Sequence, residues 1–263
     1  MQAVLRPDFS TVTEQPGQGA TRLQLEMLGT RYAWAAGRAA NKDVLEIACG
    51  TGLGLGWLAR MARTVEAGDL NDENCRVAAE TYEGREKIRV QPMDALDLPF
   101  RDRSVDLVLL FEAIYYLPDA AEFFREARRV LRPDGSLLIA MVNREWSGFN
   151  ASPFHVRYFS AAELKEALEH EGFAVTLKAG FPERRGLLDG VIRLLRRAAV
   201  WAHLIPDTMA GKEFLKRCFY GRLQGIPREL EPGKYETGSM IPIYPETNLG
   251  GYRTLYAEAR KLR

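Results

Sequence analysis

The stretch Val44-Leu45-Glu46-Ile47-Ala48-Cys49-Gly50-Thr51-Gly52-Leu53-Gly54 decides the fold of this chain. It begins as an apolar run of strand-forming residues, breaks into glycines, and continues over residues 55–62 with apolar positions at helical spacing. Open α/β sheets build nucleotide sites from a strand, a glycine-rich turn and a helix, because glycine lets a ligand approach the backbone and the helix start offers unpaired N–H groups. The stretch therefore predicts an α/β fold with a nucleotide-type ligand at this turn.

Two ligand classes compete for the turn. A dinucleotide site requires the pattern G-x-G-x-x-G, and the glycines at 50, 52, 54 and 56 give that pattern in no register. Glu46 followed by Ala-Cys-Gly-Thr-Gly instead resembles motif I of class I S-adenosylmethionine (SAM)-dependent methyltransferases. The resemblance implies that the turn wraps the methionine and ribose parts of SAM. A plain strand-to-helix turn without a ligand is the alternative.

Composition excludes several other classes of protein. The chain has 263 residues, with 36 Lys and Arg against 35 Asp and Glu, so its formal net charge of +1 creates no global field for nucleic acid. Three scattered cysteines without a C-x-x-C pair favour a reducing compartment and argue against disulfides and a zinc site. No signal peptide or membrane-spanning run is recognisable. We therefore predict a soluble, cytoplasmic protein.

Acidic residues follow the next two predicted strands. Asp69 ends the strand over residues 64–68, about 20 residues past the glycine turn, where a carboxylate accepts both hydroxyl protons of a ribose. A helix N-cap is the alternative role. Asp94 follows the strand over residues 88–91, and in the methyltransferases such an Asp-Ala pair holds the adenine. Three acidic positions at three strand ends are hard to explain by turns alone.

The resemblance covers residues 44–143 over five strands. It includes a continuous apolar run over residues 104–111, which is typical of a central strand, and a Leu-Arg-Pro-x-Gly turn over residues 131–135. Further strands are predicted over residues 173–177 and 252–258. The family fold implies a Rossmann-like sheet of seven strands in the order 3-2-1-4-5-7-6, with helices on both faces and the last strand antiparallel.

The regions outside this core are predicted to cover the site. Residues 1–42 would form an extended arm and a helix over the cofactor site, where the resemblance lets Arg31 or Tyr32 meet the SAM carboxylate, although both could equally serve packing or solvation. Residues 43–180 plus 251–263 form the predicted SAM-binding core. Residues 181–250 are too long for a simple connection and form a predicted helical insertion that caps the substrate.

Methyl transfer from a sulfonium mainly requires positioning and, for a hydroxyl acceptor, a base. Candidates lie where an aromatic loop over residues 144–159 meets the strand ends. The predicted catalytic residues are His155, Tyr116 and Tyr115. A structural role is the alternative for His155, and pocket shaping is the alternative for Tyr116. The predicted cofactor-binding residues are Arg31, Tyr32, Glu46, Ala48, Cys49, Gly50, Gly52, Asp69, Leu70, Met93, Asp94, Ala95, Phe111 and Glu112. No set of residues has metal-ligand spacing, so no metal is predicted.

The resulting hypothesis is a SAM-dependent methyltransferase that acts on an O or N nucleophile of a small molecule and releases S-adenosylhomocysteine (SAH). A sugar or secondary metabolite as acceptor rests on the resemblance alone. One alternative is an NAD-dependent oxidoreductase, disfavoured by the missing third glycine and Tyr-x-x-x-Lys pair; another is a SAM-binding regulatory protein without turnover. No nucleic-acid partner is predicted, and the protein would be a monomer or homodimer.

A predicted helix over residues 186–204 has a basic face. This face would receive an anionic or sugar-linked acceptor, or make a peripheral membrane contact, unless its charges are merely solvated. The residues that form it are Arg193, Arg196 and Arg197.

Overall fold

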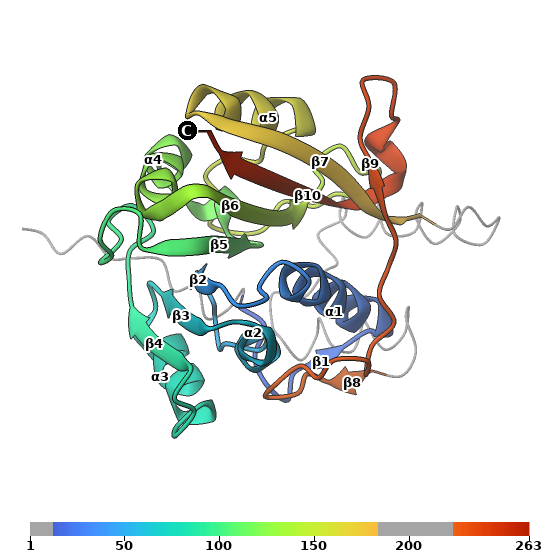
Figure 1. The fold of residues 1–263 in the computed structure, drawn as a ribbon. Helices are drawn as coiled ribbons and strands as arrows, with labels where there is room; N and C mark the ends of the chain where they lie inside the picture. The colour runs from blue at the N-terminus through green and yellow to red at the C-terminus, as the bar shows by residue number, and fades with distance from the viewer. Residues whose placement is uncertain (1–12, 184–222, 263) are drawn as a thin grey trace, which may run out of the picture.

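The computed structural model describes residues 13–183 and 223–262. The predicted helix over residues 186–204 and its three arginines therefore lie outside the described residues. The main sheet has eight strands in the order β4-β3-β2-β5-β6-β10-β7-β9 (Figure 1). Its strands are β2 (Asp43–Ile47), β3 (Thr64–Asp69), β4 (Ile88–Pro92), β5 (Val105–Phe111), β6 (Leu131–Val142), β7 (Phe173–Pro182), β9 (Met240–Pro242) and β10 (Tyr252–Lys261).

The first seven strands of that order confirm the predicted Rossmann-like topology. β4, β3, β2, β5 and β6 are parallel neighbours, and β10 pairs antiparallel with both β6 and β7. The predicted count of seven strands is wrong by one, because β9 adds an edge strand. β7 continues to Pro182, well past its predicted end at residue 177, and so offers a free edge at which Gly180 pairs with Met240.

The Leu-Arg-Pro-x-Gly segment was predicted as a turn, and the structure makes it the irregular start of β6. Leu131 pairs with Val105 and Ser136 pairs with Leu107, so four residues of β6 bulge out between neighbouring ladder positions. Asp134 within the bulge has a φ of 64°. The chain thus turns as predicted, while the pairing on both sides keeps the segment in the sheet.

Helices cover both faces of the sheet and create two hydrophobic cores (Figure 1). Alternate residues of β5 enter different cores: Leu107 and Leu109 pack towards α1 and α2, whereas Val108 and Leu110 pack towards α4 and α5. The helices are α1 (Arg22–Ala36), α2 (Leu55–Met61), α3 (Asp72–Thr81), α4 (Ala120–Val130) and α5 (Ala161–His170), with short 3-10 turns η2 (Ile114–Tyr116) and η3 (Leu249–Gly251).

Side-chain caps set where these helices begin. Thr21 caps α1 in a capping box with Gln24, and Ser160 forms the predicted capping box with Glu163 at α5. Asn71 accepts from two backbone amides at the start of α3. The α3 cap is therefore Asn71, which leaves the Asp69 carboxylate for other partners.

The described end of the insertion lies along α1 and α2. Its strand β8 (Gln224–Gly225) pairs antiparallel with β1 (Gly19–Ala20), which precedes α1. Ile226 and Leu230 are buried in the same core as α1 and α2, and the chain then rises to β9 on the far side of α1 (Figure 1). Residues 19–20 and 224–230 therefore meet beside the glycine turn, where the Leu230 amide donates to the Leu53 carbonyl at 2.7 Å.

Candidate cofactor and acceptor site

The glycine turn joins β2 to α2 and has the left-handed backbone that its composition predicts. Ala48, Gly50 and Gly52 have φ values of 54°, 54° and 75°. The Tyr82 hydroxyl donates to the Gly52 carbonyl at 2.7 Å and fixes the turn against α3. A Cβ at Gly54 would lie 2.0 Å from the Tyr32 ring, so this glycine is required for packing against α1.

Glu46 is a buried carboxylate in β2, directly before the turn. It is 1% exposed, and its Oε1 accepts a 2.6 Å hydrogen bond from the Tyr32 hydroxyl. Its Oε2 has no hydrogen-bond partner among the described residues. Burial raises the pKa of Glu46 to about 7, against the lowering effects of Tyr32 and Arg31. A buried acceptor without a partner fits a site whose ligand brings a donor.

Asp69 ends β3 and faces the same turn. Its Oδ2 accepts from the Gly50 amide at 2.9 Å, and its Oδ1 accepts from the Asn71 amide at 2.9 Å and the Asn74 side chain at 3.3 Å. It is 9% exposed, whereas Leu70 beside it is 38% exposed. The carboxylate therefore holds the glycine turn to β3 through protein donors.

The segment after β4 places its apolar residues inward and its acid outward. Met93 and Ala95 are buried. The Met93 side chain packs against Gly68, where a Cβ would lie only 2.5 Å from it. Asp94 is exposed, and its Oδ1 accepts from the Leu96 amide at 3.0 Å. The backbone of this segment thus lies next to the end of β3, as the adenine-binding prediction requires, and the role of Asp94 remains a prediction.

Arg31 is a cation in α1 that is 7% exposed and lies between two carboxylates. Its guanidinium is 2.6 Å from Glu14 and 3.6 Å from Glu112. Burial alone would lower the pKa of Arg31, but Glu14 and Glu112 raise it above its usual value. Its Nε atom has no hydrogen-bond partner among the described residues.

Glu112 connects this cation to Tyr115, which packs against the aromatic loop. It follows β5 with a φ of 52°, a left-handed conformation that is uncommon outside glycine. Its Oε2 accepts from the Tyr115 hydroxyl at 3.0 Å and from the Val142 amide at 3.1 Å. Burial raises the pKa of Glu112. Phe111, the last residue of β5, contacts the Tyr32 ring edge to face at 5.5 Å.

The aromatic loop packs against the residues that follow β5. Tyr115 stacks on Tyr158 with ring centroids 4.5 Å apart, and the Tyr116 hydroxyl lies 2.5 Å from the Ser152 hydroxyl. His155 is exposed, and its Nδ1 lies 2.7 Å from the Ser152 carbonyl. Since a carbonyl only accepts, Nδ1 carries the proton and a neutral ring leaves Nε2 as an acceptor. The three predicted catalytic residues therefore meet around one loop, and the Tyr115 hydroxyl donates to Glu112.

Sequence reasoning missed Glu14 and Asn74. Glu14 lies in the predicted arm, 17 residues before Arg31, and no local pattern links the two. Asn74 had a weak signal, because it lies one helical turn inside α3, whose start follows Asp69 directly.

Neither described cysteine indicates redox or metal chemistry. Cys49 and Cys75 are buried, and burial raises the pKa of each thiol. Within residues 13–183 and 223–262, no three His, Cys, Asp or Glu side chains gather as a metal site would require. Over the same ranges, no helix is both long enough and apolar enough to span a bilayer.

Comparison with known proteins assigns the class. Residues 45–139 match the methyltransferase domain family. A probable SAM-dependent methyltransferase of Mycolicibacterium smegmatis is 36% identical over 162 residues, which cover 60% of this chain and 62% of that relative. The chain thus spans about three fifths of that relative's length.

Solved structures show the same fold. A putative methyltransferase from Bacillus halodurans has a TM-score of 0.57 at 20% identity, over 89% of this chain and 98% of that one. The [4+2]-cyclase SpnF has a TM-score of 0.59 at 18% identity, over 90% and 81%. Residues 45–139 therefore form a domain of the SAM-dependent methyltransferase kind, and the cofactor of such domains is SAM. The orphaned Glu46 oxygen and the buried Arg31 fit such a ligand, because SAM has both an ammonium and a carboxylate.

Proposed function

We propose that this protein transfers a methyl group from SAM to an oxygen or nitrogen atom of a small molecule. The observation that carries the proposal is the gathering of Glu46, Asp69 and Glu112 at the carboxyl ends of three neighbouring strands, beside the buried Arg31. Carboxylates accept from a ribose diol and an ammonium, and a guanidinium pairs with a carboxylate. SAM presents all of these groups, whereas NAD lacks the amino-acid part.

SAM supplies a methyl group already activated by its sulfonium. The chain's own task is then to hold the acceptor in line and to take its proton. We assign the proton to Glu112, acting directly or through the Tyr115 hydroxyl bonded to it. This pair is supported by the hydrogen bond between the two side chains, by the place of Glu112 between Arg31 and the aromatic loop, and by the burial that raises the pKa of Glu112. His155, whose Nε2 is an acceptor when Nδ1 donates to the Ser152 carbonyl, is the competing base.

The acceptor side is rich in aromatic rings that carry hydroxyls. Tyr115, Tyr116 and Tyr158 gather there with Phe149, whose ring meets Tyr158 edge to face at 4.8 Å. Such a surface suits a small organic acceptor with polar substituents, such as a sugar or secondary metabolite, whereas a nucleic acid would require a basic track. The predicted cytoplasmic location and the monomeric or homodimeric state stay predictions.

The test begins with calorimetric titration of the full chain with SAH and, separately, with NAD. We expect binding of SAH and no comparable binding of NAD. Mass spectrometry of reactions with SAM and a panel of sugars, phenols, carboxylic acids and amines then reports methyl transfer. Tighter binding of NAD than of SAH would overturn the proposal. Binding of SAH without methylation of any acceptor would favour a SAM-binding protein without methyl turnover.

A further inference from the structure

Residues 13–18, here called the N-terminal strap, lie across the glycine turn. A Cβ at Gly50 would lie 2.9 Å from the methyl group of Thr13. The Thr51 hydroxyl donates to the Glu14 carbonyl at 3.1 Å. The strap therefore rests on the backbone that the proposed function assigns to the cofactor.

Asn74 joins the strap to the ribose-binding candidate. Its amide nitrogen is 3.4 Å from the Thr13 hydroxyl and 3.3 Å from Asp69 Oδ1. Its carbonyl oxygen accepts from the Gln15 side chain at 3.2 Å. Thr13 and Gln15 are thus linked to Asp69 through the side-chain amide of Asn74.

Glu14 engages the cation at the other edge. Its Oε2 lies 2.6 Å from Arg31, while Glu112, which directly follows β5, is a full ångström farther away. The Arg31 side chain is 8% exposed and the Glu14 side chain is 43% exposed. A buried cation needs an anion, but an exposed carboxylate can return to water at little cost. Glu14 is therefore the exchangeable partner of this pair.

The strap is fixed at its far end. The Gly17 amide donates to the Ile226 carbonyl at 2.8 Å, and the Ile226 amide donates to the Gln18 carbonyl at 2.9 Å. The β1–β8 ladder continues this pairing. Gly17 has a φ of 83°, and a Cβ there would meet nothing within 4 Å. The ladder therefore holds residues 17–20, whereas residues 13–15 are held separately by their contacts with Thr51 and Asn74.

We propose that the N-terminal strap is an internal competitor of the cofactor, in which the Glu14 carboxylate occupies the place on Arg31 that the ligand's carboxylate takes. This inference rests on the proposed function, because it names the regulation of the same site. Binding requires residues 13–15 to leave the glycine turn while the β1–β8 ladder keeps the strap attached.

The competition has a measurable consequence. If the binding-competent state is a fraction of the free protein, the apparent dissociation constant is the intrinsic one divided by that fraction. Removing the Glu14 charge withdraws the internal anion from Arg31 and raises that fraction. Ligands with a carboxylate gain most, since they supply the anion that Arg31 has lost.

The experiment is a calorimetric titration of full-length wild type and Glu14→Gln with SAH and with methylthioadenosine, which has the same nucleoside and lacks the amino-acid part. We expect Glu14→Gln to bind SAH at least fivefold more tightly, with a smaller gain for methylthioadenosine. Glu26→Gln is the matched control, because Glu26 loses the same charge but pairs with Arg22 on the outer side of α1. It should leave both affinities unchanged.

The possible outcomes distinguish failure of the strap proposal from failure of the proposed function. If Glu14→Gln binds SAH as tightly as wild type or more weakly, the proposal that the strap competes with the cofactor is wrong. SAH binding by wild type and by Glu14→Gln would still uphold the proposed function. A gain of equal size for both ligands would also overturn the role of Glu14 as a carboxylate competitor. Absence of SAH binding in every variant, with thermal unfolding showing them folded, would overturn the proposed function.

Discussion

Asp43 and Glu46 lie three residues apart on β2 and have opposite environments. Asp43, at the amino end, accepts from Arg63 and Thr64 and pairs with Arg132, and the Arg63 hydrogen bonds hold the pKa of its carboxyl well below the usual range. Glu46, at the carboxyl end, accepts from the Tyr32 hydroxyl, its second oxygen has no partner among the described residues, and burial raises its pKa. The same chemical group is thus neutralised by partners at one end and left incompletely paired at the other.

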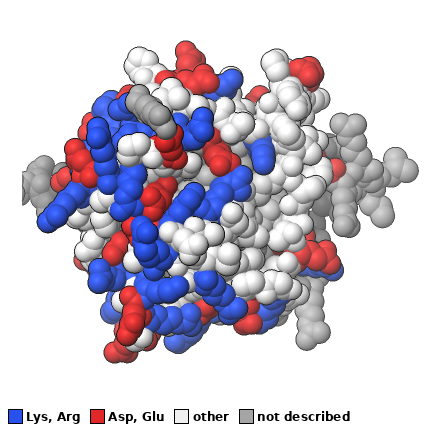
Figure 2. Space-filling view, viewed as in Figure 1, with Lys and Arg blue, Asp and Glu red and all other residues white. Residues whose placement is uncertain are grey.

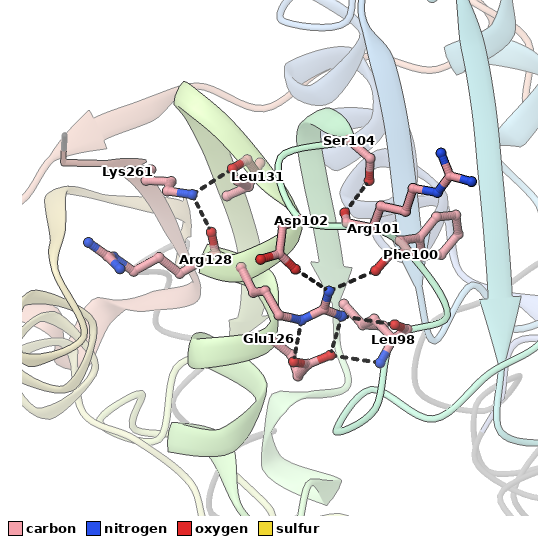
Figure 3. A network of polar contacts seen from close by, with 10 residues as sticks. Leu98, Phe100, Arg101, Asp102, Ser104, Glu126, Arg128, Leu131 and Lys261 are labelled. Carbon is pink, nitrogen blue, oxygen red and sulfur yellow. Dashed lines mark hydrogen bonds and ion pairs between the residues drawn. The ribbon is translucent and has the colours of Figure 1, made fainter.

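The contrast extends to the two ends of the sheet. At the amino end, Arg129 contacts Asp102, Glu126 and two backbone carbonyls, and Lys261 donates to the carbonyls of Arg128 and Leu131 (Figure 3). Positive and negative side chains intersperse on the left of Figure 2, where that end lies. Paired surface charges contribute modestly to stability, whereas incompletely paired buried charges lower stability and mark binding sites.

The largest effect should follow from Glu112. Glu112→Gln removes the proton acceptor, so kcat should fall by roughly 10²–10⁴-fold at saturating SAM. His155→Ala is the counter-test, because His155 is exposed and its Nδ1 is held by the Ser152 carbonyl. We expect its kcat to change by less than about tenfold, below the range for a lost general base. A severe loss in His155→Ala with an active Glu112→Gln would assign the base to the histidine.

The next largest effect is on SAH affinity, which should respond to a substitution at the carboxyl end of the sheet and not to one at the amino end. Asp69→Ala should weaken SAH binding by about 1.5–3 kcal/mol, the scale of hydrogen bonds to a charged group, as measured by calorimetry. Asp106→Ala is the amino-end control, because Asp106 accepts from the Asp43 amide at 2.8 Å and pairs with Arg132 at 2.9 Å. It should lower the midpoint of thermal unfolding and leave SAH affinity unchanged. Equal SAH affinities of Asp69→Ala and Asp106→Ala would contradict a difference between the two ends of the sheet in ligand binding.

The last prediction concerns how the stability of the ligand-free protein depends on pH. The pKa of Glu46 is about 7 when folded, and that of an unfolded glutamate is about 4.3, so its protonated form favours folding. The associated stability is fully present below about pH 4.3 and is lost as pH rises through 7. Glu46→Gln should flatten urea-unfolding free energies across that window.

Asp43 provides the opposite sign. Its pKa is lowered on folding, so its stabilisation is present above the unfolded value of about 3.9 and is lost as pH falls below it. Asp43→Asn should therefore reduce stability at neutral pH and leave the slope between pH 4.3 and 7 as in the wild type. If the slope of unfolding free energy against pH vanished in Asp43→Asn, the pH dependence would come from Asp43 at the amino end and not from Glu46.

The extent of sequence-based prediction differs between these regions. Residues 44–143 confirm the predicted order of five parallel strands, because buried parallel strands and glycine turns leave local patterns. The eighth strand was missed, since Met240–Pro242 is only three residues long and its pairing depends on how far β7 extends. The positions of Asp69 and Glu46 at strand ends followed from spacing, but the hydrogen bonds of Asp69 to Gly50 and Asn74 did not.

The sequence by itself determined the class of fold, the glycine turn and the acidic residues around it, because strand periodicity and turn chemistry act over a few residues. Only the tertiary structure decided which charges are paired. Glu14 reaches Arg31 across 17 residues, and Asp43 meets Arg132 across 89, since these contacts depend on how helices and loops pack around the sheet. The same packing buries Glu46 against Tyr32 and leaves its second oxygen without a partner among the described residues.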